Sequence, residues 1–118
     1  MLRISKQQVD AFAQDRLRQV CRKLADRLIA RHPEACEGHG PEEIAAALEP
    51  DVAFAHDQGF RSMRMLERYT DICATLGLGF GQREDWVRDV LSRRDLSPAT
   101  KLDRIEETSV FALMGSGQ

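Results

Sequence analysis

The sequence predicts an all-α fold: a compact bundle of five or six helices in a single domain. Apolar residues recur three and four positions apart along most of the chain, which is the period of one helix face. Caps and prolines mark several helix starts, and no segment alternates apolar and polar residues as a half-buried strand does. The 118 residues are enough for one domain, which we assign to residues 1–114, followed by a flexible tail at 115–118.

The first predicted helix runs to about Arg31. Ser5 is its candidate N-cap, because its side chain can accept a hydrogen bond from the backbone N–H of Gln8. Its apolar stripe is formed by Val9, Ala13, Leu17, Val20, Leu24 and Leu28. Pro33 ends the helix, since helical geometry is disfavoured for the residue before a proline.

Two further helices are predicted before residue 77. Pro41 stands at the first position of the second helix, and Pro50 is expected to kink or restart it, because proline has no N–H to donate to the preceding turn. Ser62 is the candidate cap of the third helix, whose broad apolar face should form the centre of the core.

The glycines at 77, 79 and 81 predict a flexible loop, because glycine is costly inside a helix. A phosphate-cradling function would need a preceding strand or a following lysine, and the sequence offers neither. A short helix is expected between Glu84 and Arg93. Ser97 and Pro98 then begin the last helix, which carries Leu102, Ile105, Ala112 and Leu113.

Positive charge is concentrated at the N-terminal end of the chain. Residues 1–32 carry eight Lys or Arg and three Asp or Glu, a net charge of +5, whereas residues 33–118 carry nine and sixteen, a net charge of −7. The basic first helix and the acidic remainder are expected to neutralise each other within the fold. The alternative is that the first helix presents a charged docking surface.

No apolar run is long enough to cross a bilayer, and the first residues do not form a secretion signal, so we expect a cytoplasmic protein without a membrane partner. The odd number of cysteines disfavours a disulfide framework. We therefore expect free thiols at Cys21, Cys36 and Cys73.

Two constellations have the residue types of a chemical site. His32, Cys36 and His39 are zinc-ligand types at short spacing, but structural zinc normally needs a fourth ligand, for which Cys21 or His56 would have to serve. A polar loop is the preferred interpretation, with no metal. Cys73 and His56 could form a nucleophile and base pair, but Cys73 falls on the apolar stripe of the third helix, where a buried cysteine is expected.

A small helix-turn-helix-like DNA-binding regulator is the alternative function. The third and fourth helices could form such a motif, and they carry Arg61, Arg64, Arg68 and several later arginines. Acidic residues are interleaved with these arginines, and the isoelectric point of about 5.9 is far from that of a basic nucleic-acid-binding domain. We therefore expect no nucleic-acid partner.

Several structural motifs follow one another between Gln58 and Val110. They are Gly59-Phe60, an amphipathic helix from Met65 to Leu76, a loop from Gly77 to Phe80, a short helix from Trp86 to Leu91, and the segment Lys101–Ile105 after Leu96-Ser97-Pro98. With these motifs the chain resembles a family of small helical bacterial proteins of unassigned activity, associated with type VI secretion effector gene neighbourhoods; the opening Leu2 to Gln8 is similar too. The resemblance implies an accessory of a secreted toxin, either an immunity protein or a chaperone or adaptor.

We therefore expect a non-enzymatic protein-binding module without a cofactor, whose partner is a cognate toxin or secretion component; a homodimer is left open. Protein interfaces favour arginine and aromatic residues. The expected partner-binding residues are Arg61, Arg64, Arg68, Phe80 and Trp86. For Phe80 and Trp86 the alternative is packing in the core.

Overall fold

The computed structural model describes the backbone of residues 6–116 and the side chains of residues 13–110. Within this range the chain forms helices and turns without a strand, which confirms the predicted all-α fold. The helices are α1 Lys6–Arg31, α2 Pro41–Asp57, α3 Met63–Leu76, α4 Phe80–Arg83, α5 Asp85–Leu91 and α6 Pro98–Ser116. In this part of the chain no helix combines the length and the apolar character that crossing a membrane requires.

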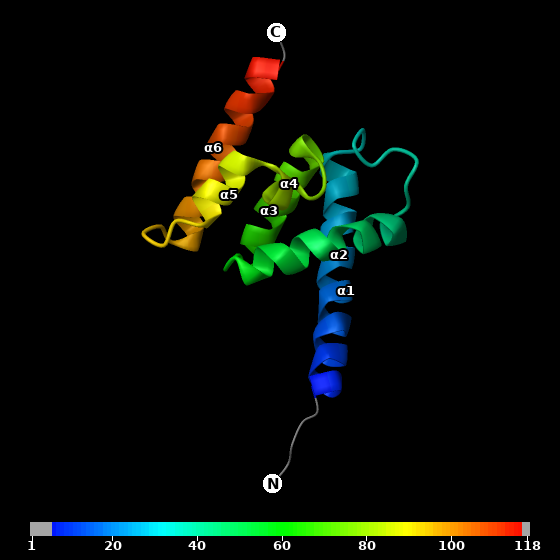
Figure 1. Ribbon diagram of the computed structural model, residues 1–118. Helices are drawn as coiled ribbons and strands as arrows, with labels where there is room; N and C mark the ends of the chain where they lie inside the picture. Colours follow the sequence, from blue (N-terminus) through cyan, green and yellow to red (C-terminus); the bar gives the residue numbers. More distant parts are fainter. Residues whose placement is uncertain (1–5, 117–118) are drawn as a thin grey trace.

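The helices form one packed centre from which two of them extend (Figure 1). α2 crosses α1, α3 packs against both, and α6 packs against α3 and α5. Cys21, Leu24, Ala25 and Leu28 bury the C-terminal half of α1 in this centre. Further towards its N-terminus, α1 extends beyond the crossing with α2. The expected Ser5 cap lies outside the described residues.

Of the two outcomes expected at Pro50, a kink or a new start, the new start is wrong, because α2 runs from Pro41 to Asp57 as one helix. Proline removes the hydrogen bond to the carbonyl of Ala46, but Ala46 and Pro50 are both exposed, so water can bind that carbonyl. On the opposite face Leu48 and Val52 are buried in the core, one before and one after the proline. Core packing therefore holds both sides of Pro50 in one helix.

The centre of the core is an aromatic row on α3. Tyr69 is fully buried, with its ring centroid 5.8 Å from that of Phe60 and 4.8 Å from that of Phe80. Phe60 comes from the turn after α2, and Phe80 begins α4. The predicted Ser62 cap is confirmed, since its hydroxyl accepts a hydrogen bond from the N–H of Met65 at 3.1 Å.

The flexible loop predicted from Gly77 to Gly81 is wrong in its second half, because α4 begins at Phe80. Gly77 and Gly79 have φ angles of 98° and 77°, a region that glycine adopts without strain. The N–H of Gly79 donates to Asp51 on α2 at 2.8 Å, and the guanidinium of Arg83 donates to the carbonyls of Leu76 and Leu78. These contacts fix the turn.

The predicted start of α6 is confirmed, because the hydroxyl oxygen of Ser97 accepts a hydrogen bond from the backbone N–H of Thr100 at 3.2 Å. Leu102 and Ile105 are fully buried. The backbone of α6 continues to Ser116, two residues past the end assigned to the domain. The side chains of Ala112 and Leu113 lie outside the described residues.

Gly81 is required by a close approach inside α4. A Cβ at this position would lie 2.3 Å from the hydroxyl oxygen of Tyr69 and 2.7 Å from a ring carbon of Phe54, whereas a Cβ at Gly40 would meet nothing within 4 Å. We expect Gly81→Ala to lower the free energy of unfolding by about 1–3 kcal/mol, because the overpacked core must shift. Gly40→Ala is the matched control, since its new Cβ meets no neighbour. Because Gly40 is the N-cap of α2, its expected loss is only that of a poorer cap, below about 1 kcal/mol. Urea denaturation measures both.

The same contact predicts a coupling between two positions. Tyr69→Phe removes the atom nearest to the new methyl group, so it should recover part of the loss caused by Gly81→Ala. A double-mutant cycle measures this coupling. Purely additive losses would contradict a direct clash between the two side chains.

The carboxyl group of Asp51 predicts a pH dependence of stability. Burial raises its pKa above the ordinary value of 3.8, although the N–H of Gly79 and the charge of Arg83 act in the opposite direction. The folded state therefore binds this proton more tightly than the unfolded state, and the stability contributed by Asp51 is lost as the pH rises through the raised pKa. Asp51→Asn should gain stability relative to the wild type from pH 4 upward, as measured by urea unfolding across pH. A difference that does not change with pH would contradict it.

Candidate protein-binding groove

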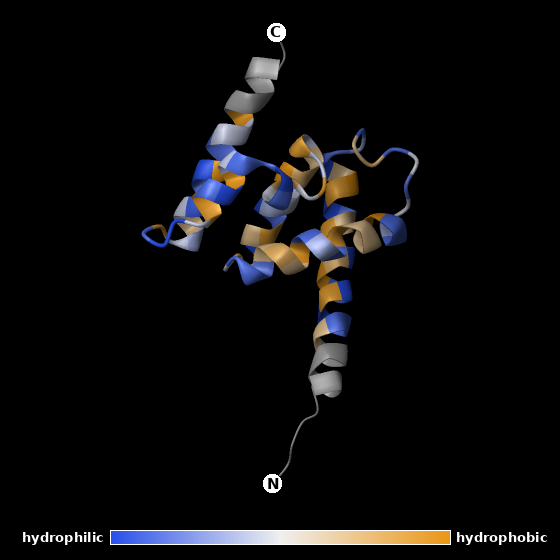
Figure 2. Cartoon of the chain, viewed as in Figure 1, coloured by the Kyte–Doolittle hydropathy of each residue, from blue (hydrophilic) through white to orange (hydrophobic). Residues whose placement is uncertain are grey.

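A groove with a volume of about 920 Å³ runs along the part of α1 that extends beyond α2. α1 forms one wall, and the end of α2 and the start of α3 form the other. Figure 2 shows apolar residues continuing along α1 past its crossing with α2. The residues of this surface, which we call the basic groove, include apolar Leu17, Val20, Val52, Met63 and Leu66 and cationic Arg16, Lys23 and Arg61.

The apolar part of the basic groove is incompletely covered by the chain itself. Val52 and Leu66 are buried at the base, but Leu17, Val20 and Met63 are only half-buried. All three are packed against the core from its outer side. The stripe predicted for the first helix is therefore covered by α2 and α3 at its C-terminal end and open to solvent at Leu17 and Val20.

Three arginines in the C-terminal half of α1 are paired with acidic residues elsewhere in the fold. Asp71 of α3 is the centre of this contact: its carboxylate lies 2.8 Å from Arg27, 3.7 Å from Arg31 and 3.1 Å from the imidazole of His32. Arg22 lies 3.5 Å from Glu42 of α2. These ion pairs confirm the predicted neutralisation for Arg22, Arg27 and Arg31.

The cations of the basic groove, unlike the paired arginines of α1, have no ion-pair partner in the described part of the chain. Arg16, Lys23 and Arg61 are exposed, and no carboxylate among the described side chains 13–110 lies within salt-bridge distance of any of them. Asp57 is the acidic residue of the groove, and it also bears no ion pair within that range. The groove thus combines open apolar surface with a net positive charge.

The five residues expected to bind a partner are not brought together on one surface. Arg61 lies in the basic groove, and Arg64 is exposed but does not line it. Phe80 is 0% exposed, so the core alternative is correct for this residue. Trp86 is half-buried and packs against the core.

Arg68 has a structural role between α3 and α6. Its guanidinium donates to Glu106 at 2.5 and 2.9 Å and to Asp103 at 2.6 Å. These hydrogen bonds, first to Glu106 and then to Asp103, raise the pKa of the guanidinium. Both carboxylates belong to α6, more than thirty residues away in sequence, so no local pattern indicates this pairing.

Arg16 and Lys23 belong to the basic first helix, which was expected either to be neutralised within the fold or to present a docking surface; its net charge does not distinguish these two from the other cations. One signal was present for Arg16, which has no acidic residue three or four positions away on its helix. The neutralisation of Arg22, Arg27 and Arg31 depends on contacts between helices and could not be recognised.

Three of the later arginines that suggested DNA binding are engaged with carboxylates. Arg83 lies 3.7 Å from Glu84, Arg93 donates to Asp95 at 2.6 Å, and Arg88 pairs with Asp85. α5 is seven residues long and follows the four-residue α4. These ion pairs reduce the charge that this part of the chain offers to phosphate groups.

The two histidines suggested as zinc ligands contact carboxylates, and the suggested cysteine ligand is buried. His32 contacts Asp71, the imidazole of His39 lies 2.6 Å from Glu43, and Cys36 is buried. Within the described residues, no group of three or more His, Cys, Asp or Glu side chains has the arrangement to hold a metal ion.

Cys73 and His56 are in different environments. Cys73 is buried on α3, and burial raises the pKa of its thiol, which disfavours the nucleophilic thiolate. His56 is exposed and lines the basic groove. The glycine turn offers no phosphate cradle either, since the N–H of Gly79 already donates to the carboxylate of Asp51.

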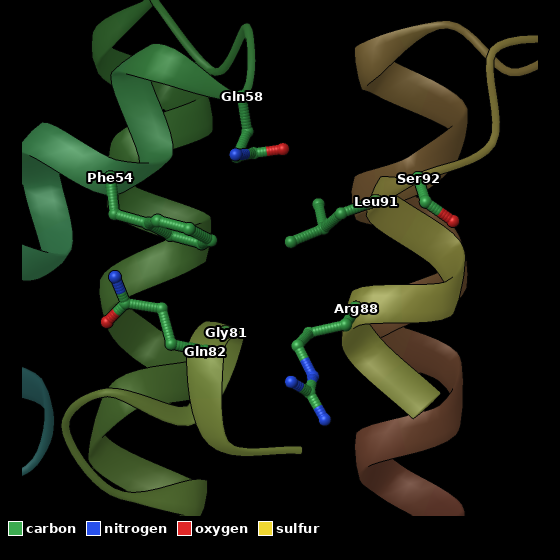
Figure 3. Close-up of a pocket in the computed structure, with 7 residues that line it drawn as sticks. All are labelled: Phe54, Gln58, Gly81, Gln82, Arg88, Leu91 and Ser92. Carbon is green, nitrogen blue, oxygen red and sulfur yellow. The ribbon is translucent and has the colours of Figure 1, made fainter. Parts of the chain in front are cut away.

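A smaller hollow of about 410 Å³ lies between α2 and α5. In Figure 3 the side chains of Phe54 and Leu91 point toward each other across it. Its cation, Arg88, is paired with Asp85. Because this hollow lacks unpaired charge, the basic groove is the better candidate for a partner.

Arg68 is bound to two carboxylates of α6, whereas Arg61 and Arg64 are exposed, so their substitutions should affect stability differently. Arg68→Ala should lower the free energy of unfolding by about 1–2 kcal/mol, because it leaves two carboxylates of α6 without their charged donor. Arg61→Ala and Arg64→Ala should each change it by less than about 0.5 kcal/mol, as surface substitutions do. Urea denaturation compares the three, and equal losses would contradict the structural role of Arg68.

Comparison with protein-family models, curated proteins and solved structures finds no match to this chain. The function must therefore be inferred from the residues of this chain. Among its surfaces, the basic groove combines unpaired charge with open apolar area.

Proposed function

We propose that the chain is a non-enzymatic protein-binding module and that its partner docks in the basic groove. The observation that supports this proposal is the coincidence, on one surface, of half-buried apolar side chains with three cations that have no carboxylate partner among side chains 13–110. A partner that covers Leu17, Val20 and Met63 would remove apolar surface from water, which drives most protein association. The cations would orient the partner and accelerate its association.

The narrower role is that of an accessory to a type VI secretion toxin in the cytoplasm, either as immunity protein or as chaperone or adaptor. Its support is the sequence resemblance between residues 58 and 110. Several residues of the shared motifs are core residues, among them Phe60, Phe80 and Leu91. The resemblance thus concerns the scaffold, and the partner's identity has to come from the groove.

Site-specific photocross-linking in the protein's own cells tests the proposal. A photoreactive amino acid replaces Ala13, which is exposed and lines the groove, or Ala99, which is exposed at the start of α6 and serves as the matched control. We expect one protein to be cross-linked from position 13 and not from position 99. Its identification as a toxin or a secretion component would support the narrower role.

Two results would contradict the proposal. Identical cross-linking from both positions would show that the groove does not select a partner. Cross-linking of nucleic acid from position 13, together with salt-dependent binding of the purified protein to duplex DNA, would favour the DNA-binding regulator instead.

A further inference from the structure

The cations of the basic groove are arranged on both of its walls. Arg16 and Lys23 are seven residues apart, so they lie on the same edge of α1, two turns or about 10 Å from each other. Arg61 stands on the opposite wall, just before α3. Between the walls lie Leu17 and Val20. A ligand that satisfies this surface must therefore have an apolar ridge with negative charge on both sides.

The backbone around the groove restricts the form of that ligand. Its walls are α1 on one side and, on the other, the end of α2, the turn that carries Arg61 and the start of α3. This described lining contains no strand edge that an extended peptide could join. A bound segment has to satisfy its own backbone hydrogen bonds while it covers apolar surface. An α-helix does this, and its apolar residues at positions i, i+3 or i+4, and i+7 form the ridge.

The dimensions of the groove fit a short helix. The groove follows α1 from Ala13 to Lys23, which corresponds to about 15 Å or three helical turns. A helix of about ten residues covers this length. Two carboxylates seven residues apart on one edge of that helix would match the spacing of Arg16 and Lys23.

A second copy of this chain fits the groove poorly. In a two-fold symmetric dimer the same patch faces itself, so Arg16, Lys23 and Arg61 of one protomer would approach the same cations of the other. Such like-charge contacts oppose association. Nucleic acid would meet the cations, but it would leave Leu17 and Val20 without an apolar partner.

We propose that the basic groove binds an acidic amphipathic α-helix of a partner protein, with its apolar ridge on Leu17 and Val20 and its carboxylates on Arg16, Lys23 and Arg61. This inference rests on the proposed protein-binding function and specifies the chemistry of the partner.

Designed peptides test this inference with the full chain. The probe is a fluorescently labelled 16-residue peptide, held helical by a side-chain lactam, with a leucine ridge and glutamates on both edges. Two companions carry glutamine or lysine in place of the glutamates. We expect saturable binding that is strongest for the acidic peptide and weakest for the lysine peptide, measured by fluorescence anisotropy. Salt should weaken binding of the acidic peptide, because the charges at the rim are exposed.

Charge reversal on the protein provides the second arm. Arg16→Glu combined with Lys23→Glu should lower the affinity for the acidic peptide roughly tenfold, because attraction becomes repulsion. The same change should raise the affinity for the lysine peptide. Arg94→Glu combined with Arg104→Glu makes the same change in net charge at exposed positions outside the groove, and it should leave the order of the peptides unchanged. Circular dichroism and urea unfolding verify that both variants are folded.

Several outcomes would overturn the inference. They are absence of saturable binding by the acidic peptide, equal binding of all three peptides, and insensitivity to the reversal of Arg16 and Lys23. A homodimer in sedimentation experiments that this reversal dissociates would assign the groove to a second copy. Selective cross-linking from Ala13 without a preference for acidic peptides would leave the protein-binding function in place and overturn only the acidic helix.

Discussion

The contact between Asp71 and the end of α1 determines how the rest of the structure is arranged. One carboxylate on α3 receives Arg27, Arg31 and His32, all within about one and a half turns of chain. This attaches the C-terminal half of α1 to α3 and pairs Arg27 and Arg31 within the fold. The N-terminal half then extends beyond α2, where Arg18 pairs with Asp15 of the same helix and Arg16 has no carboxylate partner among the described side chains. A single long helix thus serves as a core element at one end and as a candidate recognition element at the other.

The aromatic row of α3 gives this arrangement a rigid base. Tyr69 packs between Phe60 and Phe80, and the absence of a side chain at Gly81 lets α4 approach it closely. Phe60 is followed directly by Arg61 of the groove. The backbone of Arg61 is therefore held beside a fully buried residue, so this wall of the groove has a fixed backbone in the free chain.

Local sequence signals predicted most helices but few of the contacts between them. Ser62 and Ser97 act on the N–H groups three residues later, so their caps could be recognised directly. The continuity of α2 through Pro50 depends on packing on both sides of the proline, and the start of α4 at Phe80 depends on Tyr69. In both cases tertiary contacts outweigh the local preference.

The candidate site shows the same division. Arg61 was predicted because arginine is common in interfaces, and it lies in the groove, whereas Arg68 was predicted on the same grounds and is bound to Glu106 and Asp103 of α6. What distinguishes the two is whether a carboxylate distant in sequence is close in space. Arg22, Arg27 and Arg31 differ from Arg16 and Lys23 in the same way, because each has a carboxylate close in space. This difference becomes visible only in the folded chain.

The three cysteines have a consequence for the conditions under which this scaffold works. All three are buried, and burial raises the pKa of Cys21 to about 12 and raises that of Cys73 as well. Oxidants attack the exposed thiolate far more readily than the buried thiol. Cys21 and Cys73 thus sit in the core in their unreactive form. Neither α1 nor α3, the helices that carry Cys21 and Cys73, therefore exposes a thiolate to oxidants at these two positions.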